Sequence, residues 1–272
     1  MSALDPAELE TWKRAIGNTE TRHEQVELES LRRYALAVDG DPSVETALPP
    51  LPHWACFLPR PQDSEIGMDG HPRRGGFLPA ITLPRRMFAA ADIVFEAPLV
   101  LGGDAELVST VAQVTHKSGK SGDLVFVEVD RVLRQGGAVR IRERQSYVYR
   151  GVGDPVPSPT PAETLAEGEA WTPGPVNLFR FSAATFNGHR IHYDSHYAQA
   201  EEGYPGLVVH GPFTAAKLAA VAARQGPLRR FAFRAQAPLF EGHPIVLRQE
   251  GGEVRAIRCD GATAMTANVE YQ

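Results

Sequence analysis

The apolar residues of this chain change spacing between its helical and strand-forming segments. In residues 27–40, ELESLRRYALAVDG, apolar side chains recur every three or four positions and the segment stops at a glycine, which predicts a helix. Residues 90–150 instead contain four runs rich in β-branched and apolar residues, which predict four strands. Gly102–Gly103, the KSGKSG segment at 117–122 and Gly136–Gly137 separate these runs, as tight turns do in an antiparallel meander.

The same order of elements returns in the second half of the chain. Residues 178–188 predict a short helix, residues 211–226 predict a stronger one, and residues 229–272 contain four more strand runs. The two halves also contain similar short sequences. FEAPLVLGG at 95–103 resembles FRAQAPLFEG at 233–242, and RYALAVDGD at 33–41 resembles RFSAATFNGH at 180–189. Such self-similarity indicates a duplicated unit. We therefore predict an α+β fold of two helix-plus-antiparallel-sheet repeats, in which each sheet wraps around its own helix and the sheets pair edge to edge.

A change in composition marks the boundary between the two repeats. Residues 151–175, GVGDPVPSPTPAETLAEGEAWTPGP, are rich in proline, which predicts a partly extended linker. The chain is thus expected to divide into an N-terminal repeat at 1–150, this linker, and a C-terminal repeat at 176–272. A second irregular segment, residues 43–88, contains many prolines and glycines and is of the kind usually retained for a binding role.

Composition and charge narrow the class of protein. The chain has 272 residues, of which 43% are hydrophobic, enough for a substantial core. Its net charge of −5 argues against nucleic-acid binding. No run of 18 apolar residues predicts a membrane span, and the N-terminal sequence lacks the pattern of a signal peptide, so we expect a cytoplasmic protein. Cys56 and Cys259 lack metal-ligand spacing and are expected to be buried free thiols.

Histidines gather in one short segment of the second half. FNGHRIHYDSHYA, residues 186–198, contains His189, His192 and His196 beside Asn187 and Asp194, and His210 follows closely. When Asp39–Gly40 is aligned with Asn187–Gly188, Val44 of the first half falls opposite His192. The repeat can therefore fold without this histidine, which favours a chemical role for it. We expect the second half to react and the first half to hold the substrate.

These segments resemble a known family. FNGHRIHYDSHYA followed by YPGLVVHGPFTAAKLA is similar to the signature of MaoC-like hydratases and dehydratases, which have a double hotdog fold. The phrases RRYALAVDGDP, PPLPHWACFLP and DGHPRRGGFLP of the first half resemble the dehydratase-like domain of the mesaconyl-C4-CoA and itaconyl-CoA hydratase branch, and that of mitochondrial-type 3-hydroxyacyl thioester dehydratases. The resemblance covers nearly the whole chain.

The resemblance implies which residues handle protons. The catalytic histidine of the family corresponds to His192, whereas its aspartate corresponds to Asn187, a departure, because an amide cannot take up a proton at neutral pH. Either Asn187 only positions the water and His192 serves as both base and acid, or another group such as Asp194 joins in. The family's backbone N–H donor to the thioester oxygen is expected at Gly211, in HGP at the start of the predicted helix.

The resemblance also implies a substrate, an enoyl thioester of coenzyme A. It favours a short branched dicarboxylic acyl group, mesaconyl-C4-CoA or itaconyl-CoA, hydrated to citramalyl-CoA. The candidate substrate-binding residues are His189, Arg190, His210, Arg85 and Arg86, with Arg180 as a further cationic candidate. His189 either contacts the substrate or faces solvent, and His210 is expected to orient the loop.

No further cofactor, metal, membrane or nucleic-acid partner is expected, and a homodimer is the expected assembly. The glycine-rich stretches lack the strand–glycine–helix spacing that binds a dinucleotide, and Asp194 and His196 lack the spacing of a metal site. Two alternatives stay open from the sequence. One is a 3-hydroxyacyl thioester dehydratase of fatty-acid synthesis, acting on an acyl-carrier-protein or coenzyme A thioester. The other is a non-catalytic acyl-CoA binding protein.

Overall fold

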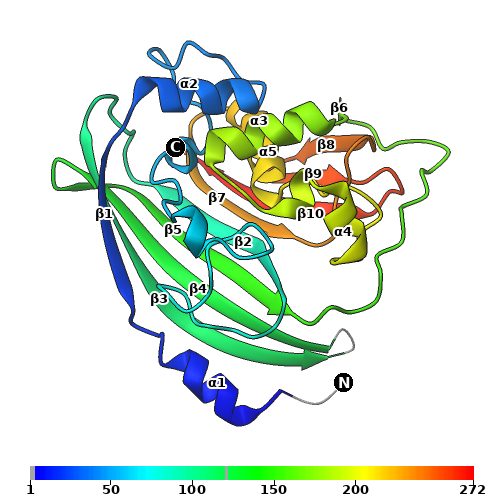
Figure 1. Ribbon diagram of the computed structural model, residues 1–272. Helices are drawn as coiled ribbons and strands as arrows, with labels where there is room; N and C mark the ends of the chain where they lie inside the picture. Colours follow the sequence, from blue (N-terminus) through cyan, green and yellow to red (C-terminus); the bar gives the residue numbers. More distant parts are fainter. Residues whose placement is uncertain (1–3, 120–121) are drawn as a thin grey trace.

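The computed structural model describes residues 4–119 and 122–272 and contains one continuous, strongly curved antiparallel sheet (Figure 1). The first half contains α1 (Pro6–Lys13), β1 (Thr19–Gln25), α2 (Leu28–Ala37), η1 (Pro52–Ala55), η2 (Asp63–Glu65), β2 (Arg85–Phe95), β3 (Asp104–Gly119), β4 (Gly122–Gln135) and β5 (Ala138–Arg150). The second half contains β6 (Glu169–Trp171), α3 (Pro175–Thr185), η3 (Arg190–His192), α4 (Ser195–Ala200), α5 (Gly211–Ala223), β7 (Leu228–Ala235), β8 (Ile245–Glu250), β9 (Glu253–Ile257) and β10 (Thr263–Tyr271).

The strand order shows the duplication directly. The order is β1-β3-β4-β5-β2-β7-β10-β9-β8-β6, so the first five strands are repeated by the last five in reverse. β2 and β7 meet in the middle, where residues 90–94 pair with residues 230–234. Arg230 donates two hydrogen bonds, of 2.8 and 2.6 Å, to the carboxylate of Asp92 across this seam. The predicted α+β repeats with edge-to-edge pairing are therefore confirmed.

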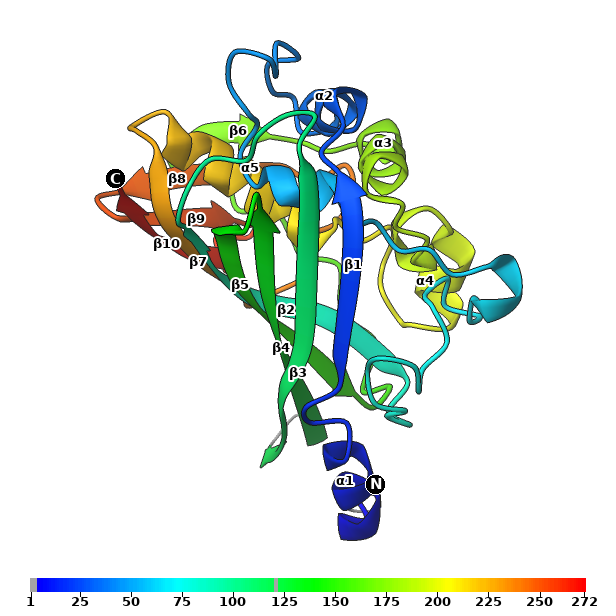
Figure 2. The same cartoon turned by 90° about the vertical axis from the view of Figure 1, so that its left-hand side faces the viewer.

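The helices break the symmetry between the halves. α5 lies against β7 to β10, so the second sheet packs around its own helix as expected (Figures 1 and 2). In the first half, the short η1 precedes the meander, and α2 packs on α3 and η1 instead of lying along its own sheet. The expectation that each sheet wraps around its own helix therefore holds for the second half only. The first half thereby leaves room between its sheet and the helices.

The main hydrophobic core joins both halves. Tyr34 of α2, Phe181 of α3 and Phe213 and Leu218 of α5 are fully or almost fully buried in one cluster with strand residues of both sheets. Burying one such side chain contributes about 1.5–3 kcal/mol, so this cluster fixes α3 and α5 relative to the first half. Val44, which the sequence places opposite His192, is buried in the same core.

Two strands were not predicted from the sequence. β1 precedes the first predicted strand run, and β6 falls inside residues 151–175, so the C-terminal sheet begins within the predicted linker. Residues 151–168 contain no helix or strand. The predicted turn at 117–122 includes residues 120–121, which lie outside the described residues. Cys56 and Cys259 are buried free thiols, as expected. Within residues 4–119 and 122–272, no helix is both long and apolar enough to cross a membrane.

Candidate active site

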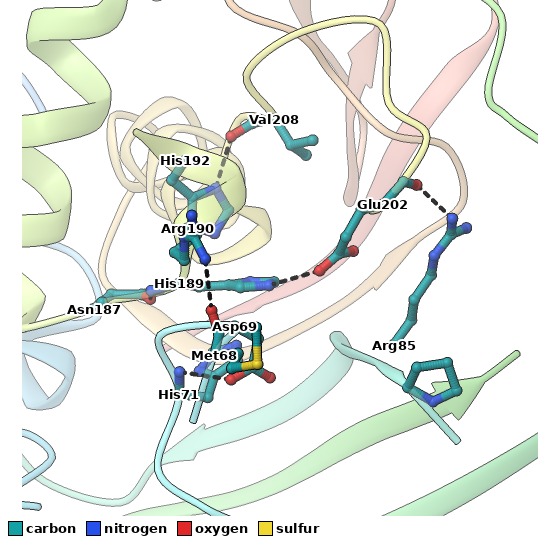
Figure 3. Close-up of polar contacts among 12 residues, drawn as sticks. Met68, Asp69, His71, Arg85, Asn187, His189, Arg190, His192, Glu202 and Val208 are labelled. Atoms are coloured by element: carbon teal, nitrogen blue, oxygen red, sulfur yellow. Dashed lines mark hydrogen bonds and ion pairs between the residues drawn. The ribbon is translucent and has the colours of Figure 1, made fainter. Parts of the chain in front are cut away.

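His192 lies at the end of η3 in the histidine loop, residues 186–194, which connects α3 to α4. Its Nδ1–H donates to the carbonyl oxygen of Val208 at 2.7 Å, so its Nε2 carries the free lone pair (Figure 3). Burial lowers the pKa of His192 to about 3, with a further contribution from His189, against the opposite effect of the bond to Val208. The ring is therefore neutral near pH 7 and offers Nε2 as a proton acceptor.

His210 supports the ring of His192 from one side. The two rings stack with centroids 3.6 Å apart. The Nε2 of His210 lies 2.8 Å from the hydroxyl of Ser182 on α3, which fixes the ring. Burial, together with the neighbouring His192, lowers the pKa of His210 well below its usual value. His210 is fully buried and does not line the cavity, so its position suits the expected role of orienting the loop better than substrate contact.

Gly211 follows His210 and begins α5. Among the described residues, none accepts a hydrogen bond from its backbone N–H. The next residue, Pro212, has no N–H and lines the cavity. The first turn of this 13-residue helix therefore presents an unused donor at the positive end of the helix dipole.

Asn187 lines the cavity on the side of the histidine loop. Its Oδ1 accepts the backbone N–H of His189 at 3.0 Å and shapes the start of the loop. With Oδ1 engaged, the Nδ2 group remains as the donor toward a ligand. Asn187 can thus hold an oxygen atom by donating a hydrogen bond, whereas its amide cannot carry a proton.

Two residues that the sequence interpretation missed complete this group. Nε2 of His189 lies 3.2 Å from Oε1 of Glu202, and both residues are buried (Figure 3). The ring of His71, from the first half, packs on that of His189 with centroids 4.2 Å apart. His189 in turn meets His192 edge-on at 5.3 Å. His71, His189, His192 and His210 therefore form one continuous row of imidazole rings.

The first half holds the histidine loop through its 67–71 loop. The backbone N–H of Arg190 donates to the carbonyl oxygen of Asp69 at 2.9 Å, and its Nη1 donates to that of Met68 at 3.1 Å. Gly70 packs directly on Gly188. The predicted irregular segment 43–88 therefore forms part of the site.

The four arginines suggested by the sequence lie in different places. Arg190 binds Asp194 through two hydrogen bonds, and Asp194 also caps the N-terminus of α4, which leaves neither group for the reaction. Arg85 is buried and donates to the carbonyl oxygen of Glu202. Arg180 is exposed on α3. Only Arg86 of this set lines the cavity, and no carboxylate among the described residues pairs with it.

The cavity has a volume of about 850 Å³ and lies between the first sheet, residues 53–78 and the end of α3. Its wall is mostly apolar, and its lining includes Asn187, Gly188, Tyr193 and Pro212, the immediate neighbours of His189, His192 and Gly211. His189, His192 and Gly211 are not themselves part of the wall. A ligand therefore reaches the reacting groups at the edge of the cavity, between the histidine loop and the start of α5.

One wall of the cavity is polar. Glu143 of β5 accepts hydrogen bonds from Nε1 of Trp54 at 2.9 Å and Nη1 of Arg131 at 3.0 Å, and His53 lies beside it. Burial alone would raise the pKa of Glu143, but Arg131 and His53 outweigh it and lower the pKa to about 2. Trp54, Arg131 and His53 line the cavity, so this wall carries polar groups and the charge of Arg131. Within the part of the chain that the structure describes, no group of three His, Cys, Asp or Glu side chains is arranged to hold a metal ion.

Comparison with known proteins places the chain in a family. Residues 51–241, which span both the 67–71 loop and the histidine loop, match the family described as hydroxyacyl-thioester dehydratase type 2. The chain belongs to this family. It is 46% identical over 272 residues to a mesaconyl-C(4)-CoA hydratase of Chloroflexus aurantiacus, an alignment that covers 95% of this chain and 97% of that protein.

Solved structures of other proteins have the same fold as this member of the hydroxyacyl-thioester dehydratase type 2 family. A MaoC-like dehydratase from Phytophthora capsici superposes with a TM-score of 0.68 at 15% identity, over 97% of each chain. A Mycobacterium tuberculosis protein described as having a double hotdog fold gives 0.54 at 12% identity, over 93% of this chain and 95% of that one. The double hotdog fold and the MaoC-like resemblance are confirmed. The protein is therefore an enzyme, a hydro-lyase of the hydratase and dehydratase type.

Proposed function

We propose that this enzyme reversibly adds water to the double bond of an enoyl-CoA with a short, branched, dicarboxylic acyl group. Mesaconyl-C4-CoA or itaconyl-CoA would be the substrate and citramalyl-CoA the product. The observation that carries the proposal is the neutral ring of His192, which is fixed by Val208 and stacks on His210, the residue before the unused N–H at the start of α5. The similarity to a mesaconyl-C(4)-CoA hydratase supports the choice of acyl group.

The start of α5 would bind the thioester oxygen. In mesaconyl-C4-CoA the double bond is conjugated with the thioester, so addition of water at the β-carbon pushes electrons onto this oxygen. The double bond of itaconyl-CoA is not conjugated with the thioester, so this role of the oxygen applies to mesaconyl-C4-CoA. A donor fixed where the charge develops stabilises the transition state more than the ground state. The backbone N–H of Gly211, reinforced by the helix dipole, meets this requirement.

His192 would transfer the proton. Its Nε2 accepts a proton from the attacking water while the water oxygen bonds to the β-carbon, and the Nδ2 group of Asn187 holds that oxygen. The resulting enolate then takes this proton from Nε2 of His192 at the α-carbon, which restores both the thioester carbonyl and the neutral ring. The addition of water neither oxidises nor reduces the substrate, so the proposal requires no cofactor beyond the coenzyme A of the substrate itself.

Arg86 would bind the second carboxylate of the substrate. It lies on the cavity wall without an acidic partner among the described residues, and it is close enough to His71 to contribute to lowering its pKa, together with burial of that ring. A guanidinium in a mostly apolar cavity binds a carboxylate strongly, since little water competes. Residues 1–150 would thus hold the acyl group, while residues 176–272 supply the reacting groups.

The mouth of the cavity would contact the coenzyme A arm. Phe179, Phe186 and Tyr193 line the cavity and are all more than half exposed, at 66%, 63% and 53%. Large apolar side chains that stay exposed around a cavity are typical of ligand contacts. The polar wall at Trp54, Arg131 and His53 disfavours a long aliphatic chain, because its methylene groups would desolvate those polar groups. This observation favours the dicarboxylic substrate over the fatty-acid alternative.

The test is a hydration assay that follows loss of the enoyl-thioester absorbance with mesaconyl-C4-CoA, crotonyl-CoA and dodecenoyl-CoA, and formation of citramalyl-CoA from itaconyl-CoA. We expect turnover of a dicarboxylic substrate, slower reaction of crotonyl-CoA and none of dodecenoyl-CoA. His192→Asn should lower kcat by about 10²- to 10⁴-fold, the usual range for loss of a general base. His196→Asn, at an exposed position on α4, is the matched control. Preference for dodecenoyl-CoA would reject the acyl assignment, and an active His192→Asn variant would reject the mechanism.

A further inference from the structure

We infer that Glu202 is a positioning residue for the hydration: its buried carboxylate orients His189 beside His192 and supplies a negative charge that the amide of Asn187 cannot supply. The inference rests on the proposed function only in taking His192 as the group that receives the proton. Neither the spacing of the sequence motif nor the family assignment points to Glu202, which lies after α4, outside the histidine loop.

The contact between Glu202 and His189 fixes the form of the imidazole. Nε2 of His189 lies 3.2 Å from Oε1 of Glu202, and a carboxylate can only accept, so this nitrogen carries the hydrogen. His189 is 5% exposed and Glu202 is 8% exposed. A carboxylate buried to this extent is costly unless it is paired, so the pair is held together strongly. A carboxylate that orients an imidazole in this way is a common arrangement in proton-transfer sites.

Glu202 is itself held in place from the other half of the molecule. Arg85 of β2 donates through Nη2 to the carbonyl oxygen of Glu202 (Figure 3). Arg85 as a whole residue is 3% exposed, and its guanidinium lies over the ring of Tyr204, with 5.8 Å from its Cζ to the ring centroid. Arg85, which the sequence suggested as a substrate contact, therefore acts by holding Glu202 and not by contacting the substrate.

His192 needs a negative charge nearby when it takes the proton, because its imidazolium forms in a buried place. The titratable and charged groups around it are His71, His189, His210, Glu202, Arg85 and Asp194. Of the two carboxylates, Asp194 is only partly buried and already neutralised by Arg190. Glu202 is buried and reaches His192 through the single ring of His189. At low dielectric, such a charge stabilises the imidazolium more than a solvated one would.

The variant Glu202→Gln separates charge from packing. Glutamine has the same length and can still accept the Nε2–H of His189, so the contact survives while the charge is lost. We expect kcat to fall about 10- to 100-fold, the range seen when the carboxylate partners of metal-bound imidazoles are removed, with KM changed less than about twofold. The solvent deuterium isotope effect on kcat should rise, because proton transfer becomes slower than the other steps. Glu201→Gln, at the exposed neighbouring position, should match the wild type.

A purely structural pair would behave differently. In that case Glu202→Gln would lower the unfolding temperature, and activity would fall only with the folded fraction, at an unchanged isotope effect. That result would overturn the inference. So would a kcat within twofold of the wild type.

A second measurement does not depend on turnover. Two-dimensional ¹H–¹⁵N spectra of the histidine side chains report which ring nitrogen carries the hydrogen. We expect a single Nε2–H form for His189 in the wild type and a mixture of forms in Glu202→Gln, whose amide can also donate. An Nδ1–H form of His189 in the wild type would overturn the inference. If no enoyl thioester is turned over by the wild type, the proposed function fails while these spectra still decide the role of Glu202.

Discussion

Gly70 and Gly188, one from each half of the chain, approach so closely that neither has room for a side chain. A Cβ atom on Gly70 would lie 1.8 Å from the carbonyl oxygen of Gly188, and one on Gly188 would lie 2.8 Å from the carbonyl oxygen of Gly70. The same contact brings His71 onto the ring of His189. The geometry of the histidine loop is therefore set by both halves together.

Replacing Gly70 with alanine should displace the 67–71 loop. Besides the clash with Gly188, Gly70 has φ of +83°, which costs a residue with a side chain about 1–3 kcal/mol. We expect a lower unfolding temperature and a loss of kcat/KM on the order of 10- to 100-fold, since small shifts of reacting groups lower the reaction rate strongly. Gly76→Ala is the control, because no atom lies within 4 Å of its added Cβ. Wild-type kinetics in Gly70→Ala would show that the loop contact is irrelevant to the reaction.

Gly211→Ala tests the start of α5 as the thioester oxygen site. The added Cβ would lie 3.4 Å from the carbonyl oxygen of Phe88, an ordinary contact, so the fold should tolerate it. A bound thioester, however, would be crowded away from the N–H. We expect kcat/KM to fall about 10- to 100-fold with little change in thermal unfolding. Gly206→Ala, which meets nothing within 4 Å, should keep full activity. Equal kinetics of the two variants would place the oxygen elsewhere.

Arg86→Gln tests the carboxylate site. Loss of the guanidinium should raise KM for mesaconyl-C4-CoA or itaconyl-CoA by about 10- to 100-fold, the cost of about 1.5–3 kcal/mol for a charged hydrogen bond. Crotonyl-CoA lacks the second carboxylate, so its kcat/KM should stay constant or rise. The exposed Arg180 provides the control variant, Arg180→Gln. A parallel loss on all substrates would instead assign Arg86 to the coenzyme A portion.

Acid should destabilise the fold through the buried histidines. The pKa of His192 falls from 6.5 to about 3 on folding, so the unfolded chain binds a proton that the folded chain excludes between these values. Its contribution to stability is complete above pH 6.5 and is lost as the pH falls toward 3, by up to about 1.4 kcal/mol per pH unit. Glu143, with a pKa lowered from 4.5 to about 2, adds a further loss below pH 4.5.

The measurement is the free energy of unfolding in urea between pH 7 and pH 4.5. His192→Asn should show a shallower pH dependence than the wild type, whereas His196→Asn, at the exposed position, should keep the wild-type slope. Identical slopes in all three proteins would mean that His192 is not buried in its neutral form.

The sequence predicted those parts of the fold that carry a strong hydrophobic pattern. The eight meander strands alternate or concentrate apolar residues between glycine turns, and each was found near its expected position. β1, TETRHEQ, was not predicted from the sequence, because an edge strand with little burial shows no apolar alternation. β6 was not predicted either, because three residues within a proline-rich segment carry no periodic signal.

The site was predictable only where its residues are close in sequence. Asn187, His192 and Gly211 could be proposed from one motif, and the structure brings them to the edge of one cavity. Glu202 and His71 carried no such signal, because their positions depend on a loop after α4 and on the irregular segment 43–88, whose path only tertiary contacts define. For the same reason the sequence could not rank Arg86 above Arg85: the two are adjacent in β2 and point to opposite faces of the strand.

The joined sheet has a consequence for assembly. Pairing of β2 with β7 leaves β1 and β6 as the outermost strands of the described sheet. β1 is polar along its whole length, and β6 has only three residues. Charged or very short outer strands resist the addition of a strand from another molecule. Neither edge of the described sheet therefore favours the open-ended strand addition that leads to fibres.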